Sequence, residues 1–221
     1  PYTRSRYYHL YLNGVYWGLF MTQERSEANW AESYLGGDDD DMDTLKSAGR
    51  ESGYVTEATD GDMNGAWRDL WDLSRSQRQS PTKSRYYEMQ GLNSNGEVDS
   101  SIPMLLDVDN LIDYVLLLGY AGAYDNSLSN FVGASNNWYS VRDSVLNNRG
   151  FVHLMHDGEH SLGAGGKWNG ANDRINTTDG NNSRDEFSKS NPQFIHMDLA
   201  ESTPEYRLRF ADRAPSNASP G

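Results

Sequence analysis

The segment Phe151-Val-His-Leu-Met-His-Asp-Gly-Glu-His-Ser-Leu-Gly163 joins a short apolar run to a cluster of acidic and histidine side chains. Its first half, up to Met155, has the composition of a β-strand, and glycines follow from Gly163 to Gly166. A strand fixes the backbone as far as the cluster, and the glycine-rich segment beyond it leaves room for a bound group. Asp157 is therefore the strongest candidate in the chain for a metal-binding carboxylate.

A second group of polar residues lies upstream of this segment. Asp125 ends an apolar, helix-like run, and an Asn-rich loop with Asn136 and Asn137 leads into the predicted strand 138–142. The chain thus presents an Asp, then an Asn, then a strand pair, then a second Asp. Protein kinases use this order for a catalytic Asp, a metal-binding Asn and a metal-binding Asp. The first carboxylate orients the attacking hydroxyl, while amide and carboxylate oxygens suit Mg²⁺.

Further motifs run in a fixed order through nearly the whole chain. They are Tyr11-Leu-Asn-Gly-Val-Tyr-Trp-Gly-Leu-Phe20, Gln23-Glu-Arg25, Gly36-Gly37, Leu45-Lys46, Asp107-Val-Asp-Asn-Leu-Ile-Asp-Tyr114, Asn136-Asn-Trp-Tyr139, His156-Asp-Gly-Glu-His-Ser-Leu162 and Pro204-Glu-Tyr-Arg-Leu-Arg-Phe-Ala-Asp-Arg213. Taken together, they resemble the spore-coat CotH-like kinase family. The resemblance implies an α+β, atypical protein-kinase-like fold. An N-terminal β-hairpin and mixed-sheet portion would precede a helical portion with a catalytic-loop hairpin.

The resemblance also implies which residues carry the chemistry. Asp125 would be the catalytic carboxylate, and Asn137 and Asp157 would bind the metal. The family's usual motif is Asp-Trp-Pro-x-Asn-Asn-Trp-Tyr, but here about half a dozen extra residues separate Asp125 from the Asn pair. An insertion can loop out at small entropic cost without moving its ends. Asn136 and Asn130 remain alternatives to Asn137, which we favour as the metal ligand.

The cofactors implied by the resemblance are ATP and Mg²⁺, with Mn²⁺ as a substitute. Lys46 would neutralise phosphate charge, as a kinase requires for a triphosphate. Glu24 would anchor this lysine, and Arg25 is an alternative phosphate contact. An ordinary surface position is the competing interpretation of Lys46.

Composition limits the class of partner. The chain has 221 residues, a formal net charge of −13 and no cysteine. The negative charge disfavours nonspecific binding to nucleic acid or anionic lipid. The absence of cysteine excludes disulfides, cysteine nucleophiles and Cys zinc sites. The longest apolar stretch, Tyr114 to Ala123, is too short to cross a bilayer, so we expect no membrane insertion.

We expect one domain over residues 1–213, followed by a disordered or non-family tail over 214–221. The resemblance implies further strands upstream of Pro1, and a location at the spore coat, the cell surface or outside the cell. Residues 163–190 are rich in Gly, Asn, Asp and Ser without apolar periodicity, which predicts a functional lid or a disordered insert.

Local patterns predict the main elements. Asn13-Gly14 between two alternating segments predicts a hairpin over 7–22, and a second hairpin is expected over 140–155. Helices are expected over 27–34 with Ser26 as its cap, over 64–73 before a polar linker 74–84, from Asp107 as a central buried helix, and over 205–213. The aromatic residues Trp67, Trp71, Tyr86 and Tyr87 fit a core better than a sugar platform.

Three functions are consistent with these features. The leading hypothesis is an ATP- and Mg²⁺-dependent phosphotransferase that acts on Ser or Thr hydroxyls of a protein substrate. The second is a noncatalytic surface or coat interaction module. The third is a hydrolase built on the carboxylates of Asp157 and Glu159, with His160 as a further acid/base or metal-binding candidate. The acidic run 38–43 lacks the spacing of an EF-hand and is interpreted as a solvated loop before a calcium site.

Overall fold

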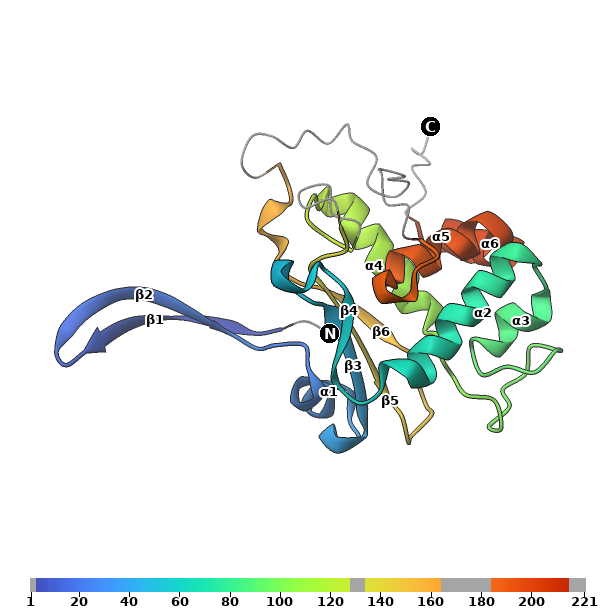
Figure 1. Cartoon of the computed structure of the whole chain (residues 1–221), viewed down its shortest axis with the longest axis horizontal. Helices are drawn as coiled ribbons and strands as arrows, with labels where there is room; N and C mark the ends of the chain where they lie inside the picture. Colours follow the sequence, from blue (N-terminus) through green and yellow to red (C-terminus); the bar gives the residue numbers. More distant parts are fainter. Residues whose placement is uncertain (1–2, 128–133, 164–183, 215–221) are drawn as a thin grey trace, which may run out of the picture.

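A four-stranded antiparallel sheet with strand order β4-β3-β5-β6 forms the centre of the fold (Figure 1). Its strands are β3 (Met42–Ser47), β4 (Thr56–Asp60), β5 (Trp138–Asp143) and β6 (Val152–Met155). The structure, a computed structural model, describes residues 3–127, 134–163 and 184–214. The second predicted hairpin, β5 and β6, is confirmed.

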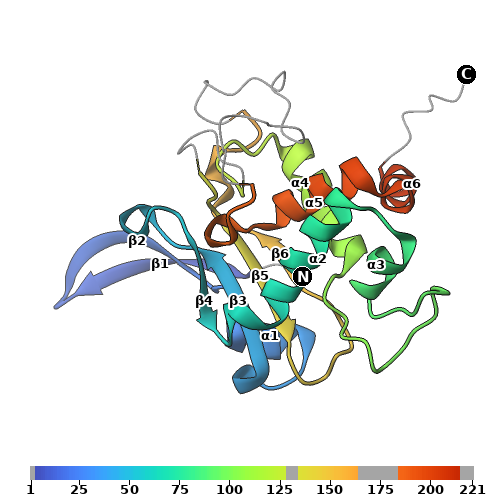
Figure 2. The same cartoon turned by 45° about the vertical axis from the view of Figure 1, so that its right-hand side comes forward.

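Helices cover both faces of this sheet. Side chains alternate along a strand, so Tyr139 and Val152 pack with α1 (Ala28–Leu35) on one face. Trp138 and Phe151 point to the other face. There they meet the larger helical layer of α2 (Arg68–Gln79), α4 (Val108–Ala121) and α5 (Pro192–Ser202) (Figures 1 and 2). The α+β class is confirmed, and the sheet lies between the larger helical layer and the single helix α1.

The predicted central helix is confirmed as α4. The Asp107 carboxylate caps its start by accepting a hydrogen bond from the backbone N–H of Asn110 at 3.0 Å. Gly122, at φ 57°, ends it in the left-handed conformation. Leu111, Ile112 and Val115 are fully or almost fully buried. The helix therefore forms the centre of the core. It ends at Ala121, four residues before Asp125.

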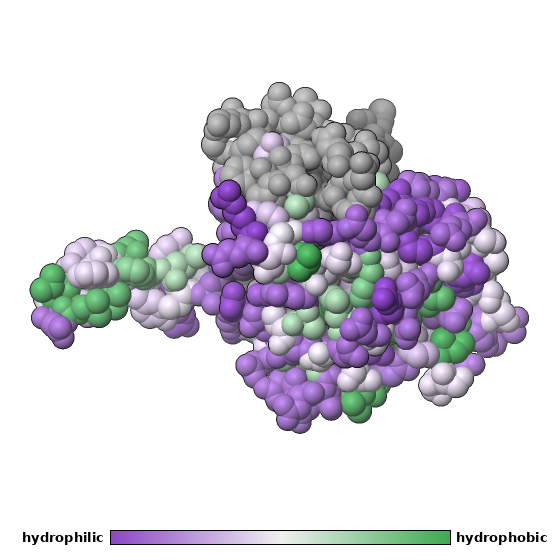
Figure 3. Space-filling view, in the orientation of Figure 1, coloured by the Kyte–Doolittle hydropathy of each residue, from purple (hydrophilic) through white to green (hydrophobic). Residues whose placement is uncertain are grey.

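The first predicted hairpin is confirmed as β1 (Ser5–Leu12) and β2 (Val15–Gln23). Asn13 and Gly14 both have positive φ, at 50° and 81°, which a tight two-residue hairpin turn requires. The hairpin projects from the body of the molecule (Figures 1 and 3). It exposes large apolar side chains on both faces, namely Tyr7, Tyr8, Tyr11, Tyr16, Trp17, Leu19, Phe20 and Met21. The hairpin therefore buries little apolar surface against the core of the domain and receives little stabilisation from it.

Two predicted helix boundaries are wrong. Helix α1 begins at Ala28 with Glu27 as its N-cap and no side-chain cap, while Ser26 is buried. Helix α2 continues to Gln79 through most of the predicted linker 74–84, and α3 (Lys83–Glu88) follows. The polar side chains there find partners on α5 and beyond: Ser74 donates to Asp198 at 3.3 Å, and Gln77 donates to Thr203 at 3.0 Å. Satisfied polar groups can be buried, so the segment stays helical.

Short turns and the last helix complete the fold. Helix α6 (Pro204–Arg213) confirms the predicted C-terminal helix. A five-residue turn, η3 (Met63–Trp67), precedes α2, and single 3₁₀ turns are η1 (Asp39–Asp41), η2 (Arg50–Ser52), η4 (Gly158–His160) and η5 (Phe187–Lys189). Trp67, Trp71 and Tyr86 lie in the core, as expected.

Parts of three predictions fall outside the described residues. Residues 164–183 make up most of the expected lid or insert over 163–190, residues 215–221 make up most of the expected tail, and Asn130 lies in the segment 128–133. Within the described ranges, every helix falls short of the length and apolar character that a bilayer span requires.

Candidate functional site

The predicted site residues converge on one edge of the four-stranded sheet. Strand β5 runs antiparallel to β3 and β6, so its start lies beside the ends of the other two. Lys46 near the end of β3 pairs with Tyr139, the second residue of β5. Asn137 directly precedes β5, and Asp157 closely follows β6. Segments far apart in the sequence thus bring a cation, an amide and a carboxylate to the same edge.

The Asp125 carboxylate is held by the two neighbouring asparagines. The side-chain amide of Asn136 donates to both carboxylate oxygens at 3.1 Å, and that of Asn137 donates to Oδ2 at 3.0 Å. Asn137 also donates to the Asp125 carbonyl at 3.2 Å. Asp125 is 8% exposed. Both ends of the inserted loop therefore meet at one fixed carboxylate, as a looped-out insertion requires.

The turn after β6 is tied to this loop and to the end of α4. The backbone N–H of His156 donates to the carbonyl of Asn137 at 3.1 Å. Tyr124 donates its backbone N–H to the carbonyl of His160 at 2.9 Å, and Leu162 donates to Ala121 at 2.6 Å. These three main-chain bonds fix the turn that carries Asp157 against Asn137 and against the end of α4.

Two of the candidate residues have left-handed backbones. Asn137 has φ 49° and Asp157 has φ 52°. Asn and Asp enter this region more readily than other non-glycine residues, but it still costs free energy. Such conformations persist where the surrounding structure fixes them, and they concentrate at functional sites. The two outliers therefore favour a functional role for this edge of the sheet.

The acidic side chains of the turn suit a divalent metal. The pKa of Glu159 is raised, chiefly by its hydrogen bond to Asp157 and then by burial. Two carboxylates in contact repel each other when both are charged, and a bound cation relieves that repulsion. These carboxylates and the side-chain oxygen of Asn137 are oxygen donors of the hard type that Mg²⁺ prefers. The residues present thus fit the expected metal.

Cationic side chains lie beside the same turn. The pKa of His156 is lowered, first by burial, and Arg25 and Lys46 lower it further while Asp157 opposes them. Tyr139 packs edge-on against His156, with ring centroids 5.2 Å apart. Arg25 and Lys46 are therefore near enough to His156 to affect its charge. Each of the two cations also has an acidic partner, Glu27 for Arg25 at 3.7 Å and Glu57 for Lys46 at 3.5 Å.

Glu24 does not join this group in the expected way. Its carboxylate accepts from the backbone N–H of Arg4 at 2.8 Å and from the hydroxyl of Tyr34 at 2.9 Å. Within the described ranges, Lys46 forms its salt bridge with Glu57, at 3.5 Å. The predicted anchoring of Lys46 by Glu24 is therefore wrong. Glu57 lies on β4, a strand whose sequence Thr-Glu-Ala-Thr-Asp carries no strong β signal, so the pairing was missed.

The remaining histidines of the segment have different surroundings. His160 lies 3.7 Å from the Glu159 carboxylate. His153 is buried, its Nδ1 lies 2.8 Å from the Ser140 hydroxyl, and burial lowers its pKa to about 3. His153 is therefore a neutral core residue, whereas His160 belongs to the turn that carries Asp157.

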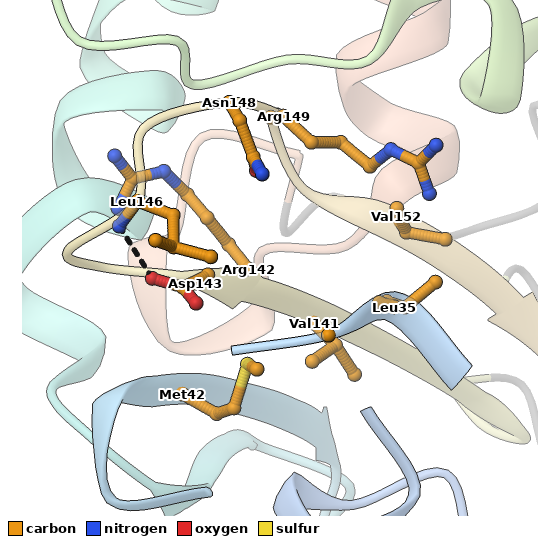
Figure 4. A pocket seen from close by; sticks show the side chains of 11 residues that line it. Leu35, Met42, Val141, Arg142, Asp143, Leu146, Asn148, Arg149 and Val152 are labelled. Atoms are coloured by element: carbon orange, nitrogen blue, oxygen red, sulfur yellow. Dashed lines mark hydrogen bonds between the residues drawn. The ribbon is translucent and has the colours of Figure 1, made fainter. Parts of the chain in front are cut away.

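A small cavity lies at the other end of β5 and is separate from this site. Its volume is about 120 Å³, and Leu35, Met42 and Val141 contribute to its lining (Figure 4). Asp143 also lines it and accepts hydrogen bonds from the backbone N–H groups of Val145 and Leu146. Asn137 directly precedes β5 and Asp143 is its last residue, so this cavity lies at the opposite end of the strand from the arrangement around Asp157.

Comparison with known proteins adds one match. A family model described as CotH kinase protein matches residues 1–214 of the chain. No curated protein and no solved structure matches it. The matched range includes every candidate site residue described above.

Proposed function

Because the chain belongs to the CotH kinase family, we propose that it is an ATP- and Mg²⁺-dependent phosphotransferase that acts on Ser or Thr hydroxyls of a protein substrate. The observation that carries the proposal is the Asp125 carboxylate, held by the amides of Asn136 and Asn137 beside the turn that presents Asp157. This arrangement has the Asp, Asn and Asp that phosphoryl transfer requires. An atypical kinase-like fold is part of the proposal.

Each residue has a specific role in this proposal. Asn137 and Asp157 would hold Mg²⁺, which would neutralise charge on the phosphates. Asp125 orients the acceptor hydroxyl and takes its proton while the hydroxyl oxygen bonds to the γ-phosphorus and ADP leaves. The asparagine amides fix the carboxylate before the substrate binds, so little reorganisation is needed. Glu159 supplies a second carboxylate next to Asp157.

Lys46 and Arg25 are proposed to contact the phosphates of the nucleotide. Both contribute to lowering the pKa of His156, which supports a position near the Asp157 turn. Lys46 is partly exposed, and its partner Glu57 is more exposed, so that salt bridge contributes little and can be exchanged for a phosphate contact. Glu24 has no role in this proposal, because its hydrogen bonds with Arg4 and Tyr34 serve the base of the hairpin.

Transfer of radiolabelled γ-phosphate to dephosphorylated casein, with Mg²⁺ or Mn²⁺, tests the proposal. The parent protein should label Ser or Thr, and Asp125→Asn should reduce the rate by about a hundredfold or more. Asp40→Asn, an exposed change of the same type on η1, is the control and should leave the rate unchanged. Equal labelling by the parent protein and Asp125→Asn would exclude Asp125 from the reaction.

A noncatalytic surface or coat module is the second candidate function. The observation that favours it is the hairpin β1–β2, with large apolar side chains exposed on both of its faces. Surfaces of this kind mark sites of protein interaction. Metal-dependent nucleotide binding separates the two candidates, since a pure interaction module has no site for the nucleotide.

A further inference from the structure

A groove of about 350 Å³ lies along α2, apart from the candidate site. Its walls come from α2, the end of α3 and the segment before α4, and they comprise Asp69, Asp72, Leu73, Ser76, Glu88, Ile102, Pro103 and Leu105. Helix α3 and the hairpin β1–β2 lie at opposite ends of the molecule (Figure 1). The groove therefore belongs to the helical end of the domain, and none of the residues proposed for phosphoryl transfer lines it.

Three exposed carboxylates of this groove have no cationic partner in the described ranges. Asp69 and Asp72 lie three residues apart on α2, and Glu88 ends α3. None of them takes part in a salt bridge within those ranges. By contrast, Asp109 and Asp113 on α4 are paired, with Arg209 at 2.6 Å and with Arg213 at 2.5 Å. The three groove carboxylates are thus left without a salt bridge in the described ranges, and Arg85 on α3 donates instead to the carbonyl of Ser76 in the groove wall at 3.2 Å.

The spacing of these carboxylates does not suit a metal ion. In the part of the chain that the structure describes, Asp38, Asp39 and Asp40 are the one group of three or more acidic or histidine side chains whose ligand atoms all lie within 4.8 Å of one another, and no groove carboxylate belongs to it. The three groove carboxylates are spread along its walls instead. They fit an extended organic cation, which can reach carboxylates several ångströms apart.

Apolar side chains complete the lining of the groove. Leu73 and Ile102 are half-buried, and Leu105 is buried at 4% exposure. An arginine side chain lays its aliphatic stem on apolar surface and directs its guanidinium to carboxylates. A volume of about 350 Å³ has room for one such side chain and an apolar neighbour. Shape and charge therefore point to the same kind of ligand.

We propose that this groove docks a basic segment of a protein partner, with an arginine next to an apolar residue. The inference does not rest on phosphotransfer, because the groove can bind such a segment whether or not the site at Asp157 is active. If the domain is a kinase, the same groove would favour substrates that carry a basic segment apart from the acceptor hydroxyl.

Fluorescence anisotropy with a labelled Gly/Ser peptide that carries the sequence arginine-leucine-arginine tests the proposal. The variant pair Asp72→Asn with Glu88→Gln removes two groove charges. The control pair Glu32→Gln with Asp40→Asn removes two exposed charges elsewhere on the chain. We expect saturable binding to the parent protein, a dissociation constant at least tenfold larger in the groove pair, and less than a twofold change in the control pair.

Other results overturn the proposal. Equal weakening in both variant pairs would show general attraction to an acidic protein, and no saturation by about 1 mM peptide would show that the groove binds no such segment. A peptide with serine in place of leucine should bind more weakly to the parent protein. Equal binding of the two peptides would show that the apolar walls take no part in recognition. Thermal unfolding of each variant pair verifies that it folds.

Discussion

The backbone N–H of His156 donates a hydrogen bond to the carbonyl oxygen of Asn137, with an N···O distance of 3.1 Å. This bond joins the residue before Asp157 to the residue that holds Asp125. The chain between Asn137 and His156 is the hairpin β5–β6, so the bond closes that hairpin at its open end. The proposed catalytic carboxylate and the proposed metal ligand are therefore positioned by the backbone of one hairpin.

The left-handed backbone of Asn137 predicts a difference between two substitutions. Asn137→Gly and Asn137→Ala both remove the side-chain bonds to Asp125, but only alanine is strained at φ 49°. Urea unfolding should find Asn137→Ala less stable than Asn137→Gly by about 1 kcal/mol. Equal stability of the two variants would show that the residue leaves this conformation at little cost.

The buried carboxylate of Asp198 should be essential for stability. It is fully buried and forms salt bridges with Arg75 and Arg184. Asp198→Ala leaves these arginines without their buried counter-charge, so we expect a loss of about 3–5 kcal/mol in the free energy of unfolding.

The control for Asp198 is Asp185→Ala. Asp185 pairs with Arg78, but its side chain is 71% exposed, so this change should cost no more than about 1 kcal/mol. Chemical denaturation of both variants measures the comparison. Similar losses in the free energy of unfolding would show that burial does not determine how much these salt bridges contribute to stability.

Acid should destabilise the fold through two buried histidines. Burial lowers the pKa of His153 to about 3 and that of His196 to about 4, below the unfolded value of about 6.5. Both stay neutral in the folded state, whereas the unfolded chain binds protons below that value. The contribution of the two neutral histidines to the free energy of unfolding is therefore complete above pH 6.5. It is lost as the pH falls toward the folded pKa values.

At pH 5 each of these histidines should reduce the free energy of unfolding by about 2 kcal/mol relative to pH 7. Urea unfolding at the two pH values measures the loss. His196→Gln should reduce it by about half, and His9→Gln on the exposed hairpin should leave it unchanged. A loss that is the same in His196→Gln and in the parent protein would contradict the assignment.

Neighbouring glycines give a matched test of packing beside the cavity at β5. A Cβ at Gly37 would meet a carboxylate oxygen of Asp143, whereas a Cβ at Gly36 would meet nothing within 4 Å. Both residues have positive φ, at 84° for Gly36 and 96° for Gly37, so alanine is strained at either position.

Gly37→Ala should therefore be less stable than Gly36→Ala by about 1–3 kcal/mol, because only the first adds a clash. Asp143 cannot easily swing away, since Val145 and Leu146 donate to its carboxylate. Thermal unfolding of both variants checks the difference. If the two variants unfold at the same temperature, the Asp143 side chain moves away at little cost and its close packing against Gly37 is not required for stability.

Sequence patterns predicted the elements with strong local signals. The hairpin at Asn13-Gly14 and the helix α4 follow from turn chemistry and apolar periodicity. Helix α5 was missed because its buried face contains polar residues such as Gln193, His196 and Asp198. Their partners come from distant segments, for example Arg75 for Asp198 and Tyr206 for His196. Pairing of this kind depends on tertiary contacts and has no local signal.

The residues of the candidate site were predicted from the sequence, but most of their contacts were not. The order of Asp125, Asn137 and Asp157 along the chain indicated the arrangement now found at one edge of the sheet. The second amide on Asp125, from Asn136, and the Lys46–Glu57 pair depend on strand register. A shift of one residue in that register would turn each side chain to the other face, and no local pattern in β4 determined it.

Thermal unfolding with ATP and Mg²⁺ tests the central claim most directly. A ligand that binds only the folded state raises its stability, and at a hundredfold excess over its dissociation constant it should raise the midpoint by about 5 °C or more. The parent protein should show this rise only with the metal present. Asp157→Asn, which tolerates the left-handed backbone, should lose it, and Asp40→Asn should retain it. An equal metal-dependent rise in the parent protein and Asp157→Asn, or no rise in either, would contradict a phosphotransfer site built on Asp157.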